Sequence, residues 1–309
     1  MTTPRFAVIF PGQGTQAPGM ASAWTDHPAW KLVEQAEAAL NEPLGTLITT
    51  APESALTRTR EAQLAVLLTS LVAWEAARPM LAGAPVCFAG HSLGQVSALI
   101  AAGALSIEDG VRFAAMRAEA TQKAADTHPG RMAALIGATP EEAEAVCAAV
   151  EGTWIANDNA PGQIVIAGTP EGIEAALAEA KNQGIKRAIP LNVGGAFHTP
   201  LMTDATTALT AVLADLPIAA PTAPVVANDD ATPVTDPEAW RIRLARHVSV
   251  PVRWRTSMAT IAELTPDACL EVGHGTMLAG LAKRTTPDLV VRSLATPNDL
   301  LTLNDPISG

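Results

Sequence analysis

The sequence predicts an α/β protein with a parallel core sheet and an inserted ferredoxin-like βαββαβ subdomain. Two short apolar runs, residues 6–10 and 85–88, have the length of buried strands, and a glycine-rich loop follows each. Between residues 131 and 191 the expected elements alternate in the order β, α, β, β, α, β. We therefore divide the chain into a main α/β subdomain, residues 1–127 and 198–309, and an inserted subdomain, residues 128–197.

The composition sets the size and the class of the protein. The chain has 309 residues, of which 48% are hydrophobic and 17% charged, so it is long and apolar enough to bury a large core. A net charge of −11 argues against nucleic acid and against anionic membranes as partners. The three cysteines show no C-x-x-C spacing, and no run reaches the ~18–20 apolar residues of a membrane span. We expect reduced thiols and a cytoplasmic protein.

The loop after the first strand has two interpretations. Gly12, Gly14 and Ala17 fit the G-x-G-x-x-A fingerprint of dinucleotide-binding proteins, which requires a helix to open at the glycines. A proline–glycine pair follows at once instead, and the first helix is expected only over residues 26–40. We therefore prefer a rigid glycine loop at the carboxyl end of the strand, where open α/β sheets bind ligands.

The second expected strand runs into Gly90-His91-Ser92-Leu93-Gly94, and an apolar run of helix length follows at residues 96–105. A G-x-S-x-G pattern at a strand-to-helix turn is a nucleophile elbow, in which glycines stand where a Cβ would clash. The serine hydroxyl then points outward, and the amide of Leu93 points to the same place from the helix N-terminus. Ser92 is the candidate nucleophile; an ordinary glycine–serine loop is the alternative.

Two expected helices supply further polar residues. A helix over residues 61–78 carries Gln63 at its start, and a helix from Ser106 to about residue 125 carries Arg117. No acidic residue lies three or four positions away from Arg117 on either side. Such an arginine either pairs with an acid from elsewhere in the fold or offers its guanidinium to a substrate carboxylate.

The inserted subdomain follows from cap and strand patterns. Thr139 and Thr169 each precede a proline and are typical helix caps. The expected elements are a strand over 132–138, a helix over 139–150, strands over 153–158 and 163–168 with a turn over 159–162, a helix over 169–182 and a strand over 185–191.

After the insert the chain returns through a glycine-rich segment to His198, just before a helix that Thr199 and Pro200 start. The positive end of a helix favours a neutral imidazole, which a general base requires. Three other histidines have no catalytic context in the sequence: His27, His128 and His247. The remainder is expected to form strands over 224–227 and 268–272, helices over 237–247 and 276–284, and a short extended piece over 251–254.

Taken together, these motifs resemble those of the malonyl-CoA:acyl-carrier-protein transacylase family of type II fatty acid synthesis, over nearly the whole chain. The matching segments are residues 11–14, 90–94, 116–117, 159–168, 196–198, 251–254 and 281–284. The resemblance implies a hydrolase-like α/β subdomain with a parallel core sheet, carrying the ferredoxin-like insert.

The resemblance also implies a role for each candidate residue. Ser92 would attack the malonyl thioester and His198 would act as the base. A backbone carbonyl near Arg253 would orient the imidazole in place of a triad acid. The remaining assignments are oxyanion-hole amides at Gln13 and Leu93, carboxylate binding at Arg117, pocket lining at Gln63, and selection against bulkier acyl units at Phe197.

The implied partners are malonyl-CoA, as a substrate, and acyl carrier protein. The resemblance implies no metal and no cofactor, and we expect a monomer. Basic residues that could dock an acidic carrier, or pair with surface acids instead, form three groups: Arg241, Arg243, Arg246, Arg253 and Arg255; Lys186 and Arg187; Lys283 and Arg284. Alternatives within the same chemistry are a malonyltransferase of a polyketide or malonate decarboxylase system and an acyl-carrier-protein hydrolase.

Overall fold

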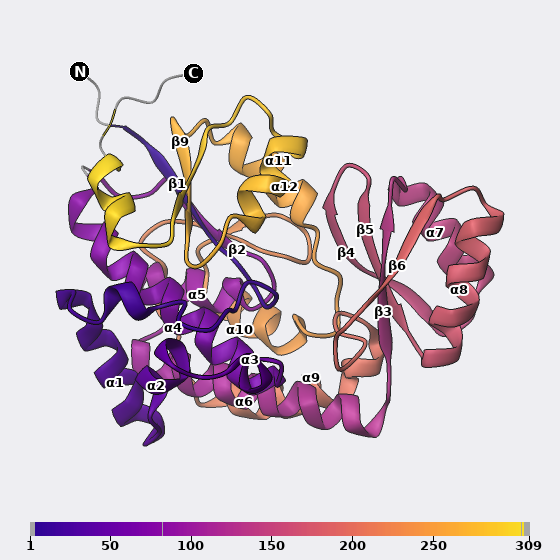
Figure 1. The fold of residues 1–309 in the computed structure, drawn as a ribbon, viewed down its shortest axis with the longest axis horizontal. Coiled ribbons are helices and arrows are strands. Elements are labelled where there is room, and N and C mark those ends of the chain that lie inside the picture. Colours follow the sequence, from indigo (N-terminus) through magenta and orange to yellow (C-terminus); the bar gives the residue numbers. More distant parts are fainter. Residues whose placement is uncertain (1–3, 82, 304, 306–309) are drawn as a thin grey trace.

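The computed structural model describes residues 4–81, 83–303 and 305, and these form a larger and a smaller lobe, each built on its own sheet (Figure 1). The larger sheet has six strands in the order β10-β9-β1-β2-β7-β8, parallel except for the β7–β8 pair. Its strands are β1 Phe6–Phe10, β2 Cys87–Gly90, β7 Val225–Val226, β8 Pro233–Val234, β9 Ala268–Val272 and β10 Val291–Leu294.

Strand β1 lies at the centre of the larger sheet, and its alternating side chains face two helical layers. Phe6, Val8 and Phe10 point into the main hydrophobic cluster, whereas Ala7 and Ile9 belong to the cluster on the opposite face. Because both faces are covered, the strand is a continuous buried apolar run, as expected for a parallel sheet.

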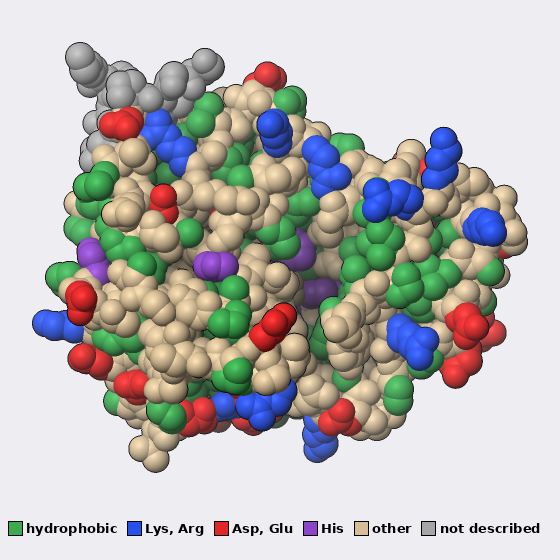
Figure 2. All heavy atoms as spheres, in the orientation of Figure 1, with side chains coloured by type: hydrophobic (Ala, Val, Ile, Leu, Met, Phe, Trp, Pro, Cys, Tyr) green, Lys and Arg blue, Asp and Glu red, His purple; other side chains and the backbone are tan. Residues whose placement is uncertain are grey.

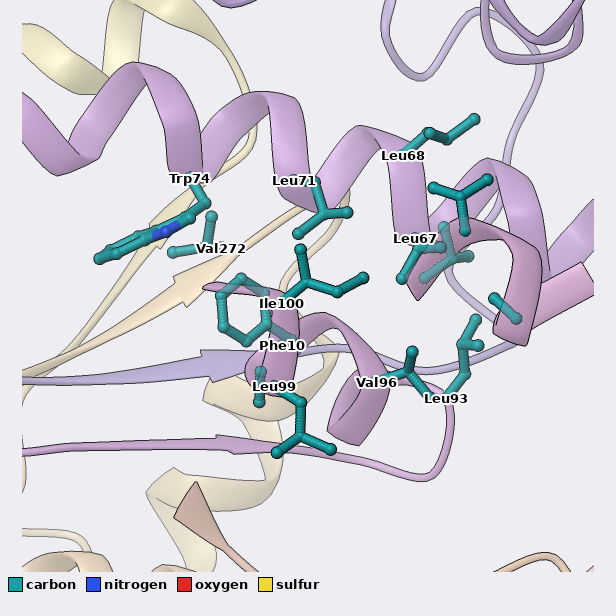
Figure 3. Packing of buried hydrophobic residues seen from close by; sticks show 14 of the residues in the cluster. Phe10, Leu67, Leu68, Leu71, Trp74, Leu93, Val96, Leu99, Ile100 and Val272 are labelled. Atoms are coloured by element: carbon teal, nitrogen blue, oxygen red, sulfur yellow. The ribbon is translucent and has the colours of Figure 1, made fainter. Parts of the chain in front are cut away.

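The helices of the larger lobe are α1 Lys31–Leu40, α2 Leu44–Thr49, α3 Glu53–Leu56, α4 Thr59–Ala77, α5 Gly94–Ala101, α6 Ile107–Thr127, α9 Thr203–Ala214, α10 Pro237–Arg246, α11 Trp254–Glu263 and α12 Met277–Thr285. Helix α4 is buried along nearly its whole length. Figure 3 shows its Leu67 and Leu71 facing Val96 and Ile100 of α5, so α4 is a core helix that fixes the helix after β2.

The smaller lobe has an antiparallel sheet of four strands in the order β4-β5-β3-β6. Its elements are β3 Arg131–Ile136, α7 Pro140–Ala149, β4 Thr153–Ala160, β5 Gln163–Gly168, α8 Pro170–Asn182 and β6 Arg187–Leu191. Thr139 forms a complete capping box with Glu142, and Thr169 caps α8. The predicted fold class, a parallel-sheet α/β unit with a ferredoxin-like βαββαβ insert, is confirmed, whereas the domain boundaries at 127/128 and 197/198 stay a prediction.

Several local expectations were wrong. The helix expected over 26–40 is shorter than expected: the 3₁₀ turn Pro28–Trp30, which His27 caps, leads into α1, and α1 itself begins only at Lys31. Strand β4 continues through Ala160, where a turn was expected. The piece over 251–254 is extended only at Val252, which bridges to Asn157; Trp254 then begins α11, which the sequence analysis missed.

The missed helix α11 has Trp254, Met258 and Ile261 on one face, buried against the larger sheet. Short elements were also missed, namely α2, α3, β8 and β10. Among the described helices, none combines the length and the apolar character required to cross a membrane.

Candidate active site

The turn between β2 and α5 brings Ser92 out of the sheet in a strained conformation, with φ of +51°. Glycine is required on both sides. A Cβ on Gly90 would lie 1.9 Å from the backbone of Gly94, and a Cβ on Gly94 would lie 2.1 Å from the carbonyl oxygen of Phe10. The G-x-S-x-G spacing therefore packs three backbone segments against one another directly beneath Ser92.

Asn228, which follows β7, holds this turn in place and was missed by the sequence analysis. Its Oδ1 accepts from the Ser92 amide at 2.8 Å, and its Nδ2 donates to the Gly90 carbonyl at 2.8 Å. Its own amide donates to Oε1 of Gln95 at 2.8 Å. A lone asparagine after a two-residue strand carries no sequence signal, because its partners lie more than 130 positions away.

His198 reaches Ser92 from the loop that follows the smaller lobe. Its Nε2 lies 2.7 Å from Ser92 Oγ, and its Nδ1 lies 3.0 Å from the carbonyl of His247 and 3.1 Å from that of Val250. A carbonyl only accepts, so Nδ1 carries the proton and Nε2 is free to take one from the serine. The orienting carbonyls are therefore those of His247 and Val250. Val250 lies three positions before Arg253, in keeping with the expected carbonyl near Arg253, whereas the carbonyl of His247 was not anticipated.

The protonation state of His198 follows from its surroundings. The residue is 4% exposed, and burial lowers the pKa of its imidazole to about 3, with further lowering from the charge of Arg117 and from His91. The two carbonyls that accept from Nδ1 oppose this shift. His198 is thus neutral at physiological pH.

The same burial predicts a pH-dependent stability. His91, His198 and His247 all have pKa values lowered by burial, so between the unfolded value near 6.5 and the lower folded values the unfolded chain binds more protons. Stability should therefore fall as pH drops below about 6.5, by as much as about 1.4 kcal/mol per pH unit for each group. Thermal unfolding of the wild type between pH 7.5 and 5 measures this.

Two variants sharpen that measurement. His247→Gln removes one buried titrating group and should reduce the pH dependence. His128→Gln, at an exposed position that contacts Asp204, should leave it unchanged. A melting temperature that stays flat from pH 7 to 5 would contradict the predicted burial of neutral imidazoles.

Arg117 extends from α6 into the same place and is 4% exposed. Its Nη2 donates to Ser92 Oγ at 3.1 Å, its Nη1 to Gln63 Oε1 at 2.5 Å, and its Nε to His247 Nε2 at 2.6 Å. Burial lowers the pKa of the guanidinium to about 9, so it remains charged at neutral pH. Within the described chain its polar partners are uncharged, and the alternative of a protein carboxylate pairing with Arg117 is not realised.

His247 thus lies within the site, and the interpretation that it has no catalytic context was wrong. It is the C-cap residue that follows α10 and is 4% exposed, and both its side chain and its carbonyl contact site residues. The sequence around His247 gave no indication of this role because its partner Arg117 is 130 positions away in the chain.

The other predicted residues fall around this centre. Phe10 pairs with Gly90 in the sheet, so the loop with Gln13 and the turn with Leu93 leave the same edge. In the part of the chain that is described, neither the Gln13 nor the Leu93 amide has a hydrogen-bond partner. Phe197 is half-buried and packs against the cores of both lobes. Figure 2 shows histidine side chains on the floor of the hollow between the lobes.

Beside this hollow, polar contacts join the smaller lobe to the larger lobe. His91 Nε2 lies 2.8 Å from Oδ1 of Asn159 on β4, and Asp158 forms a bidentate ion pair with Arg255, with the closest contact at 2.7 Å. Among the described residues no cluster of three or more histidine, cysteine, aspartate or glutamate side chains could hold a metal ion.

A serine and a neutral histidine in contact at a strand-to-helix turn form an arrangement that acyl-transferring enzymes use. Residues 7–295 match the family model described as an acyl transferase domain. The malonyl CoA-acyl carrier protein transacylase of Salmonella typhimurium is 38% identical over 300 residues, which cover 95% of this chain and 96% of that protein. The malonyl CoA-acyl carrier protein transacylase of Bacillus subtilis is 37% identical over 302 residues, which cover 96% of this chain and 95% of that protein.

Solved structures agree. The acyl-carrier-protein S-malonyltransferase of Burkholderia pseudomallei superposes with a TM-score of 0.92 at 38% identity, covering 96% of this chain and 98% of that one. A type II polyketide synthase acyl-carrier protein in complex with its malonyl-transacylase gives 0.92 at 34% identity and the same coverage. The chain belongs to the malonyl CoA-acyl carrier protein transacylase family. It is an acyltransferase, and the family resemblance predicted from its motifs is confirmed.

Proposed function

We propose that this enzyme transfers a malonyl group from malonyl-CoA to the phosphopantetheine thiol of an acyl carrier protein, through an ester on Ser92. The observation that carries the proposal is the convergence on one oxygen: Ser92 Oγ lies 2.7 Å from the His198 base and 3.1 Å from the Arg117 guanidinium. A base at this oxygen suits nucleophilic attack, and a cation beside it suits a substrate with a free carboxylate. The names of the relatives point to the same substrate and acceptor.

In the first half-reaction Ser92, on a nucleophile elbow, attacks the thioester carbon while its proton passes to Nε2 of His198. The amides of Gln13 and Leu93 hold the oxyanion, and one such donor typically lowers the barrier by ~3–4 kcal/mol. The C–S bond then breaks, and His198 returns the proton to the departing CoA sulfur. In the second half the carrier thiol gives its proton to His198 and attacks the ester, and Ser92 leaves with that proton.

The imidazolium that forms during each half-reaction is stabilised by two carbonyls instead of a carboxylate. Those of His247 and Val250 lie 3.0 and 3.1 Å from His198 Nδ1. They fix the tautomer and carry no charge of their own, so the imidazole stays a weak base and returns its proton readily.

Arg117 selects the acyl group by pairing with the distal carboxylate of malonate, and Gln63 lines the same pocket and fixes Nη1. Phe197 limits the room for branched acyl units. The elbow and oxyanion loop belong to the proposed catalytic subdomain, residues 1–127 and 198–309, and residues 128–197 form the second wall of the hollow. We assign no cofactor to the enzyme. We further propose that it is a cytoplasmic monomer that acts in fatty acid synthesis, with neither nucleic acid nor membranes as partners.

Carrier docking follows from which basic residues are already paired. Arg241, Arg243 and Arg246 bind Glu238, Asp229 and Asp230, and Arg255 binds Asp158. For these four arginines, pairing with protein acids is the correct interpretation. Within the described chain no ion pair engages the exposed side chains of Lys186, Arg187, Arg253, Lys283 and Arg284. Figure 2 shows basic side chains on the smaller lobe and above the hollow.

Transfer to an acidic carrier should therefore weaken with salt, because the exposed charges are screened within about 8–10 Å at physiological ionic strength. Reversing Lys283 and Arg284 to glutamate should raise the KM for the carrier by about 3- to 10-fold. Lys31→Glu, a single charge reversal at an exposed position on α1, is the control for the reversal of Lys283 alone and should have little effect. A transfer rate at limiting carrier that does not change with salt would reject electrostatic docking.

The proposal as a whole is tested by incubating the enzyme with malonyl-CoA and purified holo carrier proteins, with mass detection of malonyl-carrier. Carriers of fatty acid and of polyketide systems are compared side by side. Omitting the carrier separates transfer from hydrolysis: the acyl-enzyme should persist in water, whereas rapid release of malonate would identify an acyl-carrier-protein hydrolase.

A further inference from the structure

His247 contacts both the proposed base, His198, and the proposed carboxylate-binding residue, Arg117. Its carbonyl accepts from the His198 base at 3.0 Å, and its imidazole Nε2 lies 2.6 Å from Nε of Arg117. The side chain is buried at the end of α10, with 4% of the residue exposed. The backbone contact explains the orientation of His198, but it leaves the buried side chain without an assigned role.

The chemistry of the contact fixes the state of the imidazole. A guanidinium Nε carries one hydrogen and no available lone pair, so Arg117 always donates here. Nε2 of His247 must therefore accept, which requires a neutral ring with its proton on Nδ1. That Nδ1 is buried and has no hydrogen-bond partner among the described residues. Burial and the charge of Arg117 lower the pKa of His247 well below its ordinary value, in keeping with the neutral state.

The contact also decides which end of Arg117 remains available. A guanidinium has five N–H groups. His247 takes the one on Nε, Gln63 takes one on Nη1, and Ser92 Oγ takes one on Nη2. The remaining two hydrogens are one on Nη1 and one on Nη2. A carboxylate therefore has one N–H on each Nη atom to bind, whereas the side of the fork that includes Nε is occupied by His247.

We propose that His247 is a positioning residue for acyl specificity, which holds Nε of Arg117 so that the Nη1–Nη2 end faces the carboxylate of the acyl group. This inference rests on the proposed function, because it requires a substrate carboxylate. A neutral acceptor suits the role: an aspartate or glutamate in this place would pair with Arg117 and weaken its attraction for the substrate. An apolar residue would leave the Nε–H buried without a partner and the guanidinium free to turn.

The test compares His247→Leu, which removes the acceptor, with His247→Gln, which offers an amide oxygen, using malonyl-CoA and acetyl-CoA. His247→Leu should lower the ratio of malonyl to acetyl kcat/KM about 10-fold or more, mainly through a higher KM for malonyl-CoA. His247→Gln should restore the malonyl KM to within about threefold. His128→Leu, the same change at an exposed histidine, is the matched control. Equal losses for both substrates, or an unchanged malonyl KM in His247→Leu, would overturn the inference.

Two further measurements separate this inference from the proposed function. In the Arg117→Ala background, His247→Leu should cause no additional loss of malonyl transfer, since its effect passes through Arg117; an added loss would overturn the inference. If Arg117→Ala affects malonyl and acetyl equally, Arg117 does not select the acyl group and the inference about His247 is overturned with that role. Failure of the proposed function is a different result, namely that the wild type forms no malonyl-carrier. Nitrogen-15 spectra of the wild type give the tautomer without any variant: Nδ1–H supports the inference, and Nε2–H or a protonated ring at neutral pH overturns it.

Discussion

Replacing Ser92 with alanine should lower malonyl transfer by about 10⁴-fold or more, because among the described residues no other hydroxyl contacts both His198 and Arg117. The hydroxyl is the atom on which His198 and Arg117 converge, and the variant removes it without adding bulk. The fold should persist, since the Asn228 contact is to the backbone amide of residue 92. Initial rates with malonyl-CoA and holo carrier measure the effect.

The matched control is Ser54→Ala, at an exposed position on α3, which should transfer at the wild-type rate. Substrate binding should survive in Ser92→Ala, so malonyl-CoA should still protect it against heat. Residual transfer above about 1% of wild type, with the protein folded, would show that the acyl group moves without the serine ester.

Replacing Arg117 with alanine should reverse the choice of acyl group. The guanidinium is buried, charged and paired only with neutral groups among the described residues, so a bound carboxylate gains a charge-assisted bidentate contact. Loss of that contact is worth roughly 2–5 kcal/mol, or about 30-fold to several thousand-fold in kcat/KM for malonyl-CoA. Acetyl-CoA leaves this charge unpaired in the wild type, so its transfer should hold or improve in the variant.

Arg112→Ala, on the same helix but exposed beside Asp109, serves as the control and should leave both substrates unaffected. The ratio of malonyl to acetyl kcat/KM is the quantity to measure. A ratio unchanged from wild type in Arg117→Ala would remove Arg117 from substrate selection.

Local patterns predicted much of the fold. The alternation of strands with capped helices at Thr139 and Thr169 specified the smaller lobe, since each cap and each strand is encoded within a few residues. The same holds for the turn at Ser92, where the glycine spacing itself is the signal. Helix α11 was missed because its start at Trp254 follows a proline-containing extended piece and has no side-chain cap.

The site was predicted where residue type and local context coincide, as at Ser92, Arg117 and His198. Asn228 and His247 were missed because they act through contacts 130 or more positions away. His247 shows why such residues are difficult to predict. Its carbonyl orients the base, and because every residue has a backbone carbonyl, the residue type does not reveal this role. Whether Arg117 was paired with an acid also depended on tertiary structure, and its neutral partners Gln63 and His247 come from other helices.

The central claim is that Ser92 carries the malonyl group between donor and acceptor. Intact-mass spectrometry after brief exposure to malonyl-CoA tests it most directly. The account predicts an adduct of ~86 Da that maps to the peptide containing Ser92 and disappears when holo carrier protein is added. An unmodified enzyme that nevertheless forms malonyl-carrier, or an adduct on any other residue, would contradict it.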